Sequence, residues 1–237
     1  NHFDIHGGGQ DLQFPHHENE IAQSEATHDC KMANYWVHNG FVKIDDEKMS
    51  KSLGNFSTIR SITDMVKPEV VRFFMLRAHY RSPLNYSFEQ LSEAQKSLTT
   101  LYLSIRGAEK DPGFKIDWSN PYAKDFKIGL DDDFNTPEAL SVVFNLANEI
   151  NKNKVDYLYN QNLLISLSNI LGILTMNPDE FLQGENNQSL DVEKLIKERN
   201  TAKETKDFKT ADKIRTLLLD NDIIIEDTPE GTTWRKK

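Results

Sequence analysis

Two lysines three positions apart stand in the most informative stretch of the chain, Lys48-Met49-Ser50-Lys51-Ser52, which Leu53-Gly54-Asn55 follows. The ammonium of lysine is a compact charge on a flexible stem, and such charge matters most where negative charge moves in a transition state. The spacing, with small hydroxyl residues and a Gly-Asn turn, predicts a mobile cationic loop that folds over a polyphosphate. For the bare Lys-x-x-Lys pattern, a solvated surface loop is the alternative.

A stretch rich in glycine and histidine, residues 6–20, lies upstream of these lysines. Three successive glycines, Gly7 to Gly9, allow a backbone to approach a ligand closely. Asp11 follows at a position where a carboxylate could bind a ribose hydroxyl, as in dinucleotide-binding folds. The G-x-G-x-x-G spacing of those folds is not present, so this motif is not assigned.

The same stretch carries residues that could bind a metal ion. Pro15 is typical of the first turn of a helix, which would place His16 and Glu20 four residues apart on one face. An imidazole and a carboxylate at that spacing suit zinc. The pair His17 and Glu20 is also geometrically possible. The alternative is a polar helix start whose acidic residues lie near the positive end of the helix dipole.

Taken together, these residues resemble the cysteinyl-tRNA synthetases, and residues 48–52 resemble the KMSKS signature of class I aminoacyl-tRNA synthetases. The resemblance covers essentially the whole chain, through residues 34–41 to residues 231–237. The fold it implies is α/β plus mostly α: the second half of a class I Rossmann-like catalytic domain, a DALR-type helical bundle and a small α+β C-terminal module. The family's HIGH signature and two zinc-binding cysteines would precede Asn1. We therefore expect a C-terminal part of a longer polypeptide, inactive in isolation.

The resemblance also implies an activity, the ATP-dependent ligation of L-cysteine to tRNA(Cys) through a cysteinyl-adenylate. Zinc would bind the substrate thiolate, which it favours over the hydroxyl of serine. The implied cofactors are one Zn²⁺, shared with cysteines outside this chain, and Mg²⁺ with ATP. The implied roles are as follows: Lys48, Lys51 and His6 are catalytic; Gly9, Gln10, Asp11 and Lys51 bind ATP; His16 and Glu20 bind zinc.

The C-terminal module resembles the anticodon reader of that family, and the matching positions are Lys203, Phe208, Asp212 and Asp227. Lys203 stands where arginine is usual, and it cannot make the planar two-pronged contact of arginine. Phe208 stands where tryptophan is usual, and it can still stack on an unpaired base. Trp234 is predicted to pack in the last hairpin, where its indole N–H needs a partner.

Hydrophobic periodicity and turn-forming residues divide the chain into four parts. Residues 1–62 are assigned to the catalytic domain, with helices over about 15–29 and 31–40 and a strand over 41–44. Residues 63–177 form the helical bundle, in which a helix is expected over 68–77 and another begins with Thr136 as cap and Pro137 in the first position. Residues 178–190 are a predicted linker. Residues 191–237 are expected to fold as two helices and a β-hairpin.

Composition fits a soluble chain without a membrane span, because no apolar run approaches the roughly 20 residues required. The single cysteine, Cys30, excludes an intrachain disulfide and suits a reducing cytosol, so a cytoplasmic location is expected. The net charge is −9, yet residues 190–237 carry 11 basic and 11 acidic side chains. RNA contact is therefore most plausible in that segment and through local patches. A monomer is expected.

Two other functions are compatible with parts of this sequence. The related ligase that joins cysteine to a glucosaminyl-inositol in mycothiol synthesis shares the fold, the zinc site and the signature loop, but lacks the anticodon-reading terminus. A synthetase-derived tRNA-binding module without catalysis would gain nothing from Lys48 and Lys51. The C-terminal module of this chain therefore disfavours the mycothiol-type ligase, and Lys48 and Lys51 disfavour a module without catalysis.

Overall fold

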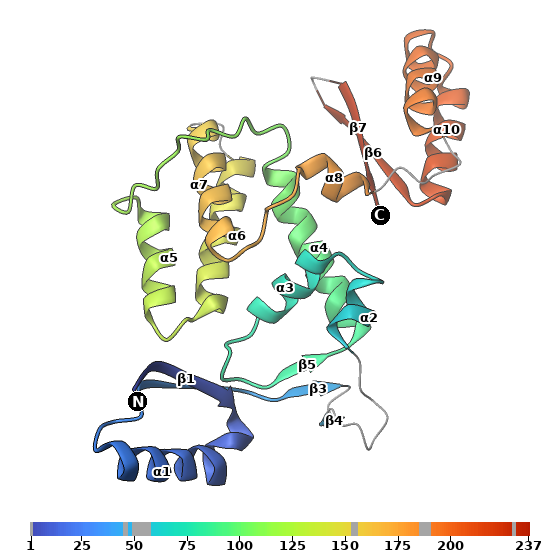
Figure 1. Cartoon of the computed structure of the whole chain (residues 1–237). Coiled ribbons are helices and arrows are strands. Elements are labelled where there is room, and N and C mark those ends of the chain that lie inside the picture. Colours follow the sequence, from blue (N-terminus) through green and yellow to red (C-terminus); the bar gives the residue numbers. More distant parts are fainter. Residues whose placement is uncertain (1, 45–46, 49–57, 153–155, 185–190, 229–230) are drawn as a thin grey trace.

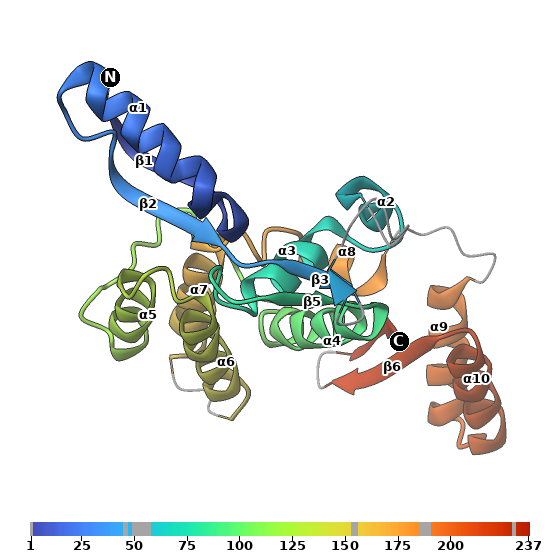
Figure 2. The ribbon, with the colours of Figure 1, turned by 90° about the horizontal axis from the view of Figure 1, so that it is seen from below.

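The computed structural model describes residues 2–44, 47–48, 58–152, 156–184, 191–228 and 231–237. Its N-terminal part is a βαβ unit, in which β1 (Phe3–Gly9) and β2 (Ala33–Asn39) are parallel and α1 (Glu18–His28) connects them. Two short turns, Gln10–Leu12 and Gln13–His17, join β1 to α1. Figure 2 shows this unit projecting away from the helices of the bundle.

The prediction of a helix over residues 31–40 is wrong, because residues 33–39 form the strand β2 instead. The aromatic and β-branched residues Tyr35, Trp36 and Val37 fit a pleated surface, and they pair in register with residues 5–7 of β1. The helix expected from about residue 15 takes regular α form only from Glu18, after a π-helical turn that contains Pro15.

A second small sheet follows, in the order β4-β3-β5. The strand β3 (Val42–Ile44) agrees with the prediction; it pairs antiparallel with β4 (Glu47–Lys48) and parallel with β5 (Leu84–Tyr86). The loop before β5 is fastened to the helical bundle at Asp133, whose carboxylate accepts hydrogen bonds from Tyr80 Oη (2.7 Å) and Arg81 Nη1 (2.8 Å). This contact joins the sheet region to the bundle.

The central bundle holds the main hydrophobic core. Its helices are α2 (Ile59–Thr63), α3 (Pro68–Leu76), α4 (Phe88–Ser104), α5 (Pro121–Asp131), α6 (Thr136–Lys152) and α7 (Tyr157–Ile170) (Figure 1). Apolar side chains at helical spacing on α3, α4, α6 and α7 are buried together, among them Phe73, Leu98, Val143 and Leu164. On α6, Leu140, Val143 and Ala147 belong to this core and Phe144 packs against it, so they form an apolar stripe at helical spacing. No helix of the described ranges is long and apolar enough to cross a membrane.

The start of α6 differs in detail from the prediction. Asn135, not Thr136, caps the helix, since its Oδ1 accepts a hydrogen bond from the Glu138 N–H at 3.3 Å. Thr136 instead donates its hydroxyl to the carbonyl oxygen of Leu76 at 2.9 Å. That bond ties the start of α6 to the end of α3.

A buried polar network crosses the bundle core. The Tyr102 hydroxyl donates to Glu69 Oε2 at 2.6 Å and accepts from the Met176 N–H at 3.2 Å. The other oxygen of Glu69 accepts from the Thr175 N–H at 3.2 Å. Burial and the Glu69 carboxylate raise the pKa of Tyr102, so the phenol stays protonated and keeps donating.

The C-terminal module has its own small core. It comprises α9 (Val192–Glu204), α10 (Phe208–Asp220) and the hairpin of β6 (Ile223–Thr228) and β7 (Gly231–Lys236), as the sequence predicts. Trp234 is 4% exposed, and its indole N–H donates to Glu193 Oε1 at 2.9 Å, which confirms both its packing role and its need for a partner. The segment expected as a linker begins with a short helix, α8 (Pro178–Gln183), which Asn177 caps.

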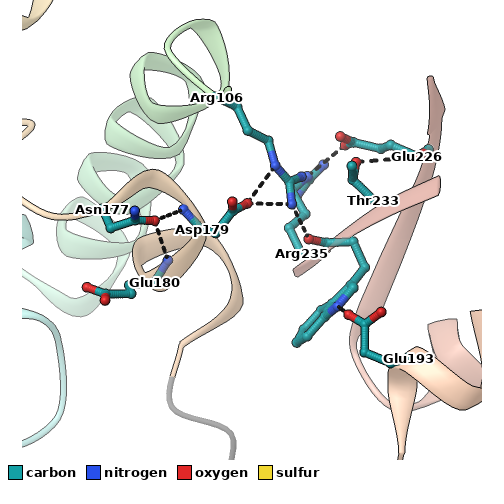
Figure 3. Close-up of polar contacts among 9 residues, drawn as sticks. Arg106, Asn177, Asp179, Glu180, Glu193, Glu226, Thr233 and Arg235 are labelled. Atoms are coloured by element: carbon teal, nitrogen blue, oxygen red, sulfur yellow. Dashed lines mark hydrogen bonds and ion pairs between the residues drawn. The ribbon is translucent and has the colours of Figure 1, made fainter. Parts of the chain in front are cut away.

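Arg106 joins the bundle to the C-terminal module (Figure 3). Its Nε donates to Asp179 of α8 at 2.9 Å, and its Nη2 donates to the carbonyl oxygen of Trp234 at 3.0 Å. The neighbouring Arg235 donates from Nε to Glu226 Oε1 at 2.9 Å. One guanidinium at the end of α4 therefore holds α8 and β7 together.

Candidate functional site

One face of the β1–β2 sheet gathers the side chains that could do chemistry. Strand alternation puts His6 and Gly8 on the same face of β1, and the register places them beside Trp36 and His38 of β2. The rings of His6 and Trp36 lie 4.7 Å apart between centroids, and those of Trp36 and His38 stack at 6.3 Å. The result is an aromatic, imidazole-rich surface.

Residues at the start of α1 complete this surface. His6 Nε2 lies 3.0 Å from Glu20 Oε2, and His17 Nδ1 lies 2.8 Å from His38 Nε2. Ligand atoms of His6, His17 and Glu20 all lie within 4.8 Å of one another. Two imidazoles and a carboxylate are nitrogen and oxygen donors of the kind that zinc accepts, so the site is chemically suited to that ion.

The structure does not bring His16 into this group. His16 is solvent exposed, whereas His17 is buried at 4% exposure and belongs to the same helical face as Glu20. Regular α-helix begins at Glu18, and His17 is its N-cap residue with helical backbone angles, whereas His16 lies further back in the preceding turn. The alternative pair that the sequence allowed, His17 with Glu20, is the one gathered here.

Glycine is required where β1 passes under His17. A β-carbon at Gly8 would lie 2.9 Å from Cε1 of His17, closer than real contacts allow, and 3.1 Å from its Nε2, which is tighter than most. The absence of a side chain at Gly8 therefore lets the imidazole of His17 lie directly over the strand.

The residues expected to bind ATP follow at the carboxyl end of β1. Gly9 is its last residue, and Gln10 and Asp11 lie in the turn after it. Ligands of parallel α/β sheets bind at the carboxyl ends of strands, so this position suits the expectation. The backbone of Lys48 lies in β4, paired with Lys43. Lys51 and the rest of the signature, residues 49–57, lie outside the described residues.

His38 was not anticipated from the sequence. Burial, and then the neighbouring charges of His17, His6 and Arg81, lower the pKa of His38 below its ordinary value. A neutral His38 can share a single proton with His17 across their 2.8 Å contact. The alternation of Trp36 and His38 would have predicted this pair, had residues 33–39 been assigned to a strand.

A second polar cluster lies in the C-terminal module, where the structure brings together Lys203 and Asp227. Lys203 Nζ lies 3.0 Å from Asp227 Oδ2, and the Thr232 hydroxyl donates to Asp227 Oδ1 at 2.8 Å. Arg199 donates to both oxygens of the same carboxylate, each at 2.9 Å. These donors, with Arg199 first, hold the pKa of Asp227 far below its ordinary value.

Arg199 makes a planar two-pronged contact with Asp227, whereas Lys203 offers a single ammonium to the same carboxylate. It lies one helical turn before Lys203 on α9 and is 6% exposed. Phe208, the first residue of α10, exposes 61% of its surface, which leaves its ring open for stacking. Asp212 is exposed one turn further along α10. Arg199 and Lys203 are four residues apart, so they lie on the same helical face. This spacing is the sequence pattern that could have indicated the cluster.

Three family models match the chain in order. They are the tRNA synthetases class I (C) catalytic domain over residues 1–96, the DALR domain over residues 125–175, and the cysteinyl-tRNA ligase anticodon binding domain over residues 188–235. These matches agree with the expected order of a class I catalytic part, a helical bundle and an anticodon module.

Curated relatives match nearly the whole chain. The cysteine--tRNA ligase of Methylobacillus flagellatus is 57% identical over 238 residues, and that of Aromatoleum aromaticum is 52% identical over 240 residues. Both alignments cover 99% of this chain, but only 52% and 51% of those relatives. The chain thus spans about half the length of the curated relatives it matches.

A solved structure supports the fold. The LeuRS–tRNA–LeuAMS ternary complex of Agrobacterium radiobacter K84 superposes with a TM-score of 0.50 at 14% identity, over 74% of this chain and 28% of that chain. At this identity the likeness concerns the fold alone.

Proposed function

Because the chain belongs to the cysteine–tRNA ligase family, we propose that the protein containing it joins L-cysteine to tRNA(Cys) at the expense of ATP. The observation that carries this proposal is that Glu20 and the two histidines before α1 belong to the same βαβ unit as Gly9 and Asp11, which lie at the carboxyl end of β1. A candidate metal site and a candidate nucleotide site therefore lie within one βαβ unit.

The reaction has two steps in this proposal. A carboxylate oxygen of cysteine attacks the α-phosphorus of ATP, so that cysteinyl-adenylate forms and pyrophosphate leaves. A ribose hydroxyl of the terminal adenosine of the tRNA then attacks the carbonyl carbon, and AMP leaves. Gly9, Gln10 and Asp11 hold the nucleotide, since the backbone of Gly9 can approach it closely. Lys48 and Lys51 stabilise the phosphates, with Mg²⁺, as charge develops on them.

The proposed metal ligands are Glu20 and His16. His17 is 4% exposed and its Nδ1 is engaged with His38, which suits a residue that supports the site, whereas His16 is exposed in the turn before α1. The rival ligand set is His6, His17 and Glu20, the group within 4.8 Å. When bound, zinc supplies a soft Lewis acid that prefers a thiolate to a hydroxyl.

In the same proposal, His6 faces the amino acid and the adenylate. Its Nε2 lies 3.0 Å from Glu20, so the carboxylate orients the ring. The C-terminal module reads the anticodon through Lys203, Phe208, Asp212 and Asp227. Phe208 offers the stacking surface, and the Arg199–Asp227 pair fixes the shape of the neighbouring polar surface.

The test uses the full-length protein that contains this chain. We expect ATP–pyrophosphate exchange that depends on cysteine and is far weaker with serine, followed by transfer of cysteine to tRNA(Cys). Transfer to a glucosaminyl-inositol in place of tRNA would establish the mycothiol-type ligase instead. Binding of tRNA without any exchange would leave only a binding module.

A further inference from the structure

A cationic cleft lies where the helical bundle meets the C-terminal module. Its volume is about 450 Å³, and its walls come from α4, the end of α8 and the end of β7. Five basic residues line it, namely Lys67, Lys96, Arg235, Lys236 and Lys237, and no Asp or Glu of the described chain is among the lining residues. This concentration of positive charge contrasts with a chain whose net charge is −9.

One wall of the cleft offers neutral donors as well as charge. Ser92, Gln95, Thr99 and Thr100 line it together with Lys96. Their positions on α4 repeat every three or four residues, so they form one face of that helix. Thr99 and Thr100 donate their hydroxyls to the carbonyl oxygens of Gln95 and Lys96 at 2.8 and 3.1 Å, so Ser92, Gln95 and Lys96 supply the donors of this face. Hydroxyl, amide and ammonium groups of this kind contact phosphate oxygens in nucleic-acid complexes.

Two carboxylates close to the walls of the cleft have arginine partners. Glu226 accepts from Arg235 at 2.9 Å, and Asp179 accepts from Arg106 at 2.9 Å (Figure 3). Neither Lys96 nor Lys236 forms an ion pair with a carboxylate in the described part of the chain. The Lys236 ammonium lies close to Gly184 at the end of α8, since a β-carbon there would be 3.2 Å from its Nζ.

The cleft is held open by rigid contacts. Its floor includes Phe181, 5% exposed, whose ring stacks on Tyr102 with 3.9 Å between centroids. Arg106 binds both α8 and the backbone of β7, which fixes two walls relative to α4. A site whose walls are fixed before binding loses less conformational entropy when a ligand enters.

We propose that this cleft binds the phosphodiester backbone of the tRNA between the part read by the C-terminal module and the end that reaches the β1–β2 sheet. The inference rests on the proposed function. The C-terminal module and the βαβ unit lie at opposite ends of the molecule, with α4 and α8 between them (Figures 1 and 2). An RNA that contacts both ends has to pass along the bundle, and backbone contacts there position it without reading sequence.

The test compares Lys96→Gln/Lys236→Gln with the matched control Lys124→Gln/Lys152→Gln, two exposed lysines on α5 and α6 outside the cleft. The full-length proteins are titrated with tRNA(Cys) over a series of KCl concentrations. Loss of two phosphate contacts reduces the slope of log K against log[KCl] by about 1.5. We expect this reduction, with about fivefold weaker binding of tRNA(Cys), for the cleft variant but not for the control variant. The cleft variant should lose the same amount of affinity for a tRNA with an altered anticodon.

The outcomes separate this inference from the proposed function. Cysteine-dependent ATP–pyrophosphate exchange by the cleft variant should equal that of the wild type, which shows that the fold is intact. A wild-type salt slope in the cleft variant, or the same loss in the control, overturns the cleft as a tRNA site while leaving the ligase proposal standing. A wild-type protein that does not prefer tRNA(Cys) over other tRNAs overturns the proposed function instead.

Discussion

Arg199 holds Asp227 by two parallel hydrogen bonds of 2.9 Å each, and this pair joins α9 to β6 in the C-terminal module. The Arg199 side chain is 7% exposed, while the Asp227 side chain is 46% exposed and its carboxylate also accepts hydrogen bonds from Lys203 and Thr232. The buried partner is therefore structural, and the exposed partner presents its remaining surface outward. The pair explains how the module keeps a defined polar face although Lys203 stands where arginine is usual.

Replacing Asp227 by Asn should destabilise the module, because the buried guanidinium of Arg199 would lose its charged acceptor. We expect a cost of about 1–3 kcal/mol in the free energy of unfolding. Urea unfolding of this chain, followed by Trp234 fluorescence in a Trp36→Phe/Trp118→Phe background, measures it. The control Asp220→Asn, at an exposed position on α10, should change the free energy by less than about 0.5 kcal/mol. Equal losses in both variants would remove the special role of the pair.

The same pair predicts a dependence on pH. The pKa of Asp227 is lowered in the folded state, so its stabilising contribution is present above the unfolded pKa of about 3.9 and is lost as pH falls below it. The free-energy difference between the wild type and Asp227→Asn should therefore shrink on acidification from pH about 5 to pH about 2. A difference that stays constant over this range would contradict the assignment.

Zinc binding separates the two ligand sets. Glu20→Gln should lower zinc affinity by more than about tenfold in the full-length protein, since Glu20 belongs to both sets. If His16 is the imidazole ligand, His16→Ala should match that loss and His17→Ala should cost less. Zinc content after equilibrium dialysis against a chelator gives the ranking, and the exposed His28→Ala provides the control. A larger loss for His17→Ala and His6→Ala would assign the ion to the group within 4.8 Å.

Lys51→Ala should slow adenylate formation far more than it weakens cysteine binding, because its charge is needed mainly when the phosphates carry developing charge. We expect a decrease of at least about a hundredfold in the rate of ATP–pyrophosphate exchange with little change in the KM for cysteine. Lys43→Ala, in the neighbouring strand β3, is the matched control. An unchanged exchange rate in Lys51→Ala would remove the catalytic role.

Local signals predicted the C-terminal module and helix α1, but they failed for the strand β2. Asp191 and Asp207 each cap a helix through their own side chains, so α9 and α10 could be placed from a few neighbouring residues. The strand β2 depends on pairing with β1, which lies some thirty residues earlier, and no pattern in the residues around β2 indicates this pairing. The contacts of His17 with His38 and of Arg199 with Asp227 also join distant segments, which explains why His38, Trp36 and Arg199 were missed.

Removing the Tyr102 hydroxyl should destabilise the bundle. In Tyr102→Phe the buried Glu69 carboxylate loses a donor at 2.6 Å, and the Met176 N–H loses its acceptor. We expect a loss of about 2–3 kcal/mol, since buried polar groups left unpaired cost about that much. Thermal unfolding compared with Tyr159→Phe, which changes a residue 37% exposed, measures the effect. A cost no larger than that of the control would mean that the network contributes nothing to stability.

Alkaline unfolding tests the same network independently. Burial and the Glu69 carboxylate raise the pKa of Tyr102, so the folded state retains a proton that the unfolded state releases above pH about 10. Stability from this group is therefore complete below that pH and falls as pH rises further. We expect the stability of the wild type to decline more steeply than that of Tyr102→Phe between pH about 9 and pH about 11. If stability depended on pH in the same way for both proteins, the Tyr102 phenol would ionise as readily in the folded chain as in the unfolded one. The Glu69 carboxylate would then not help to retain the phenol proton.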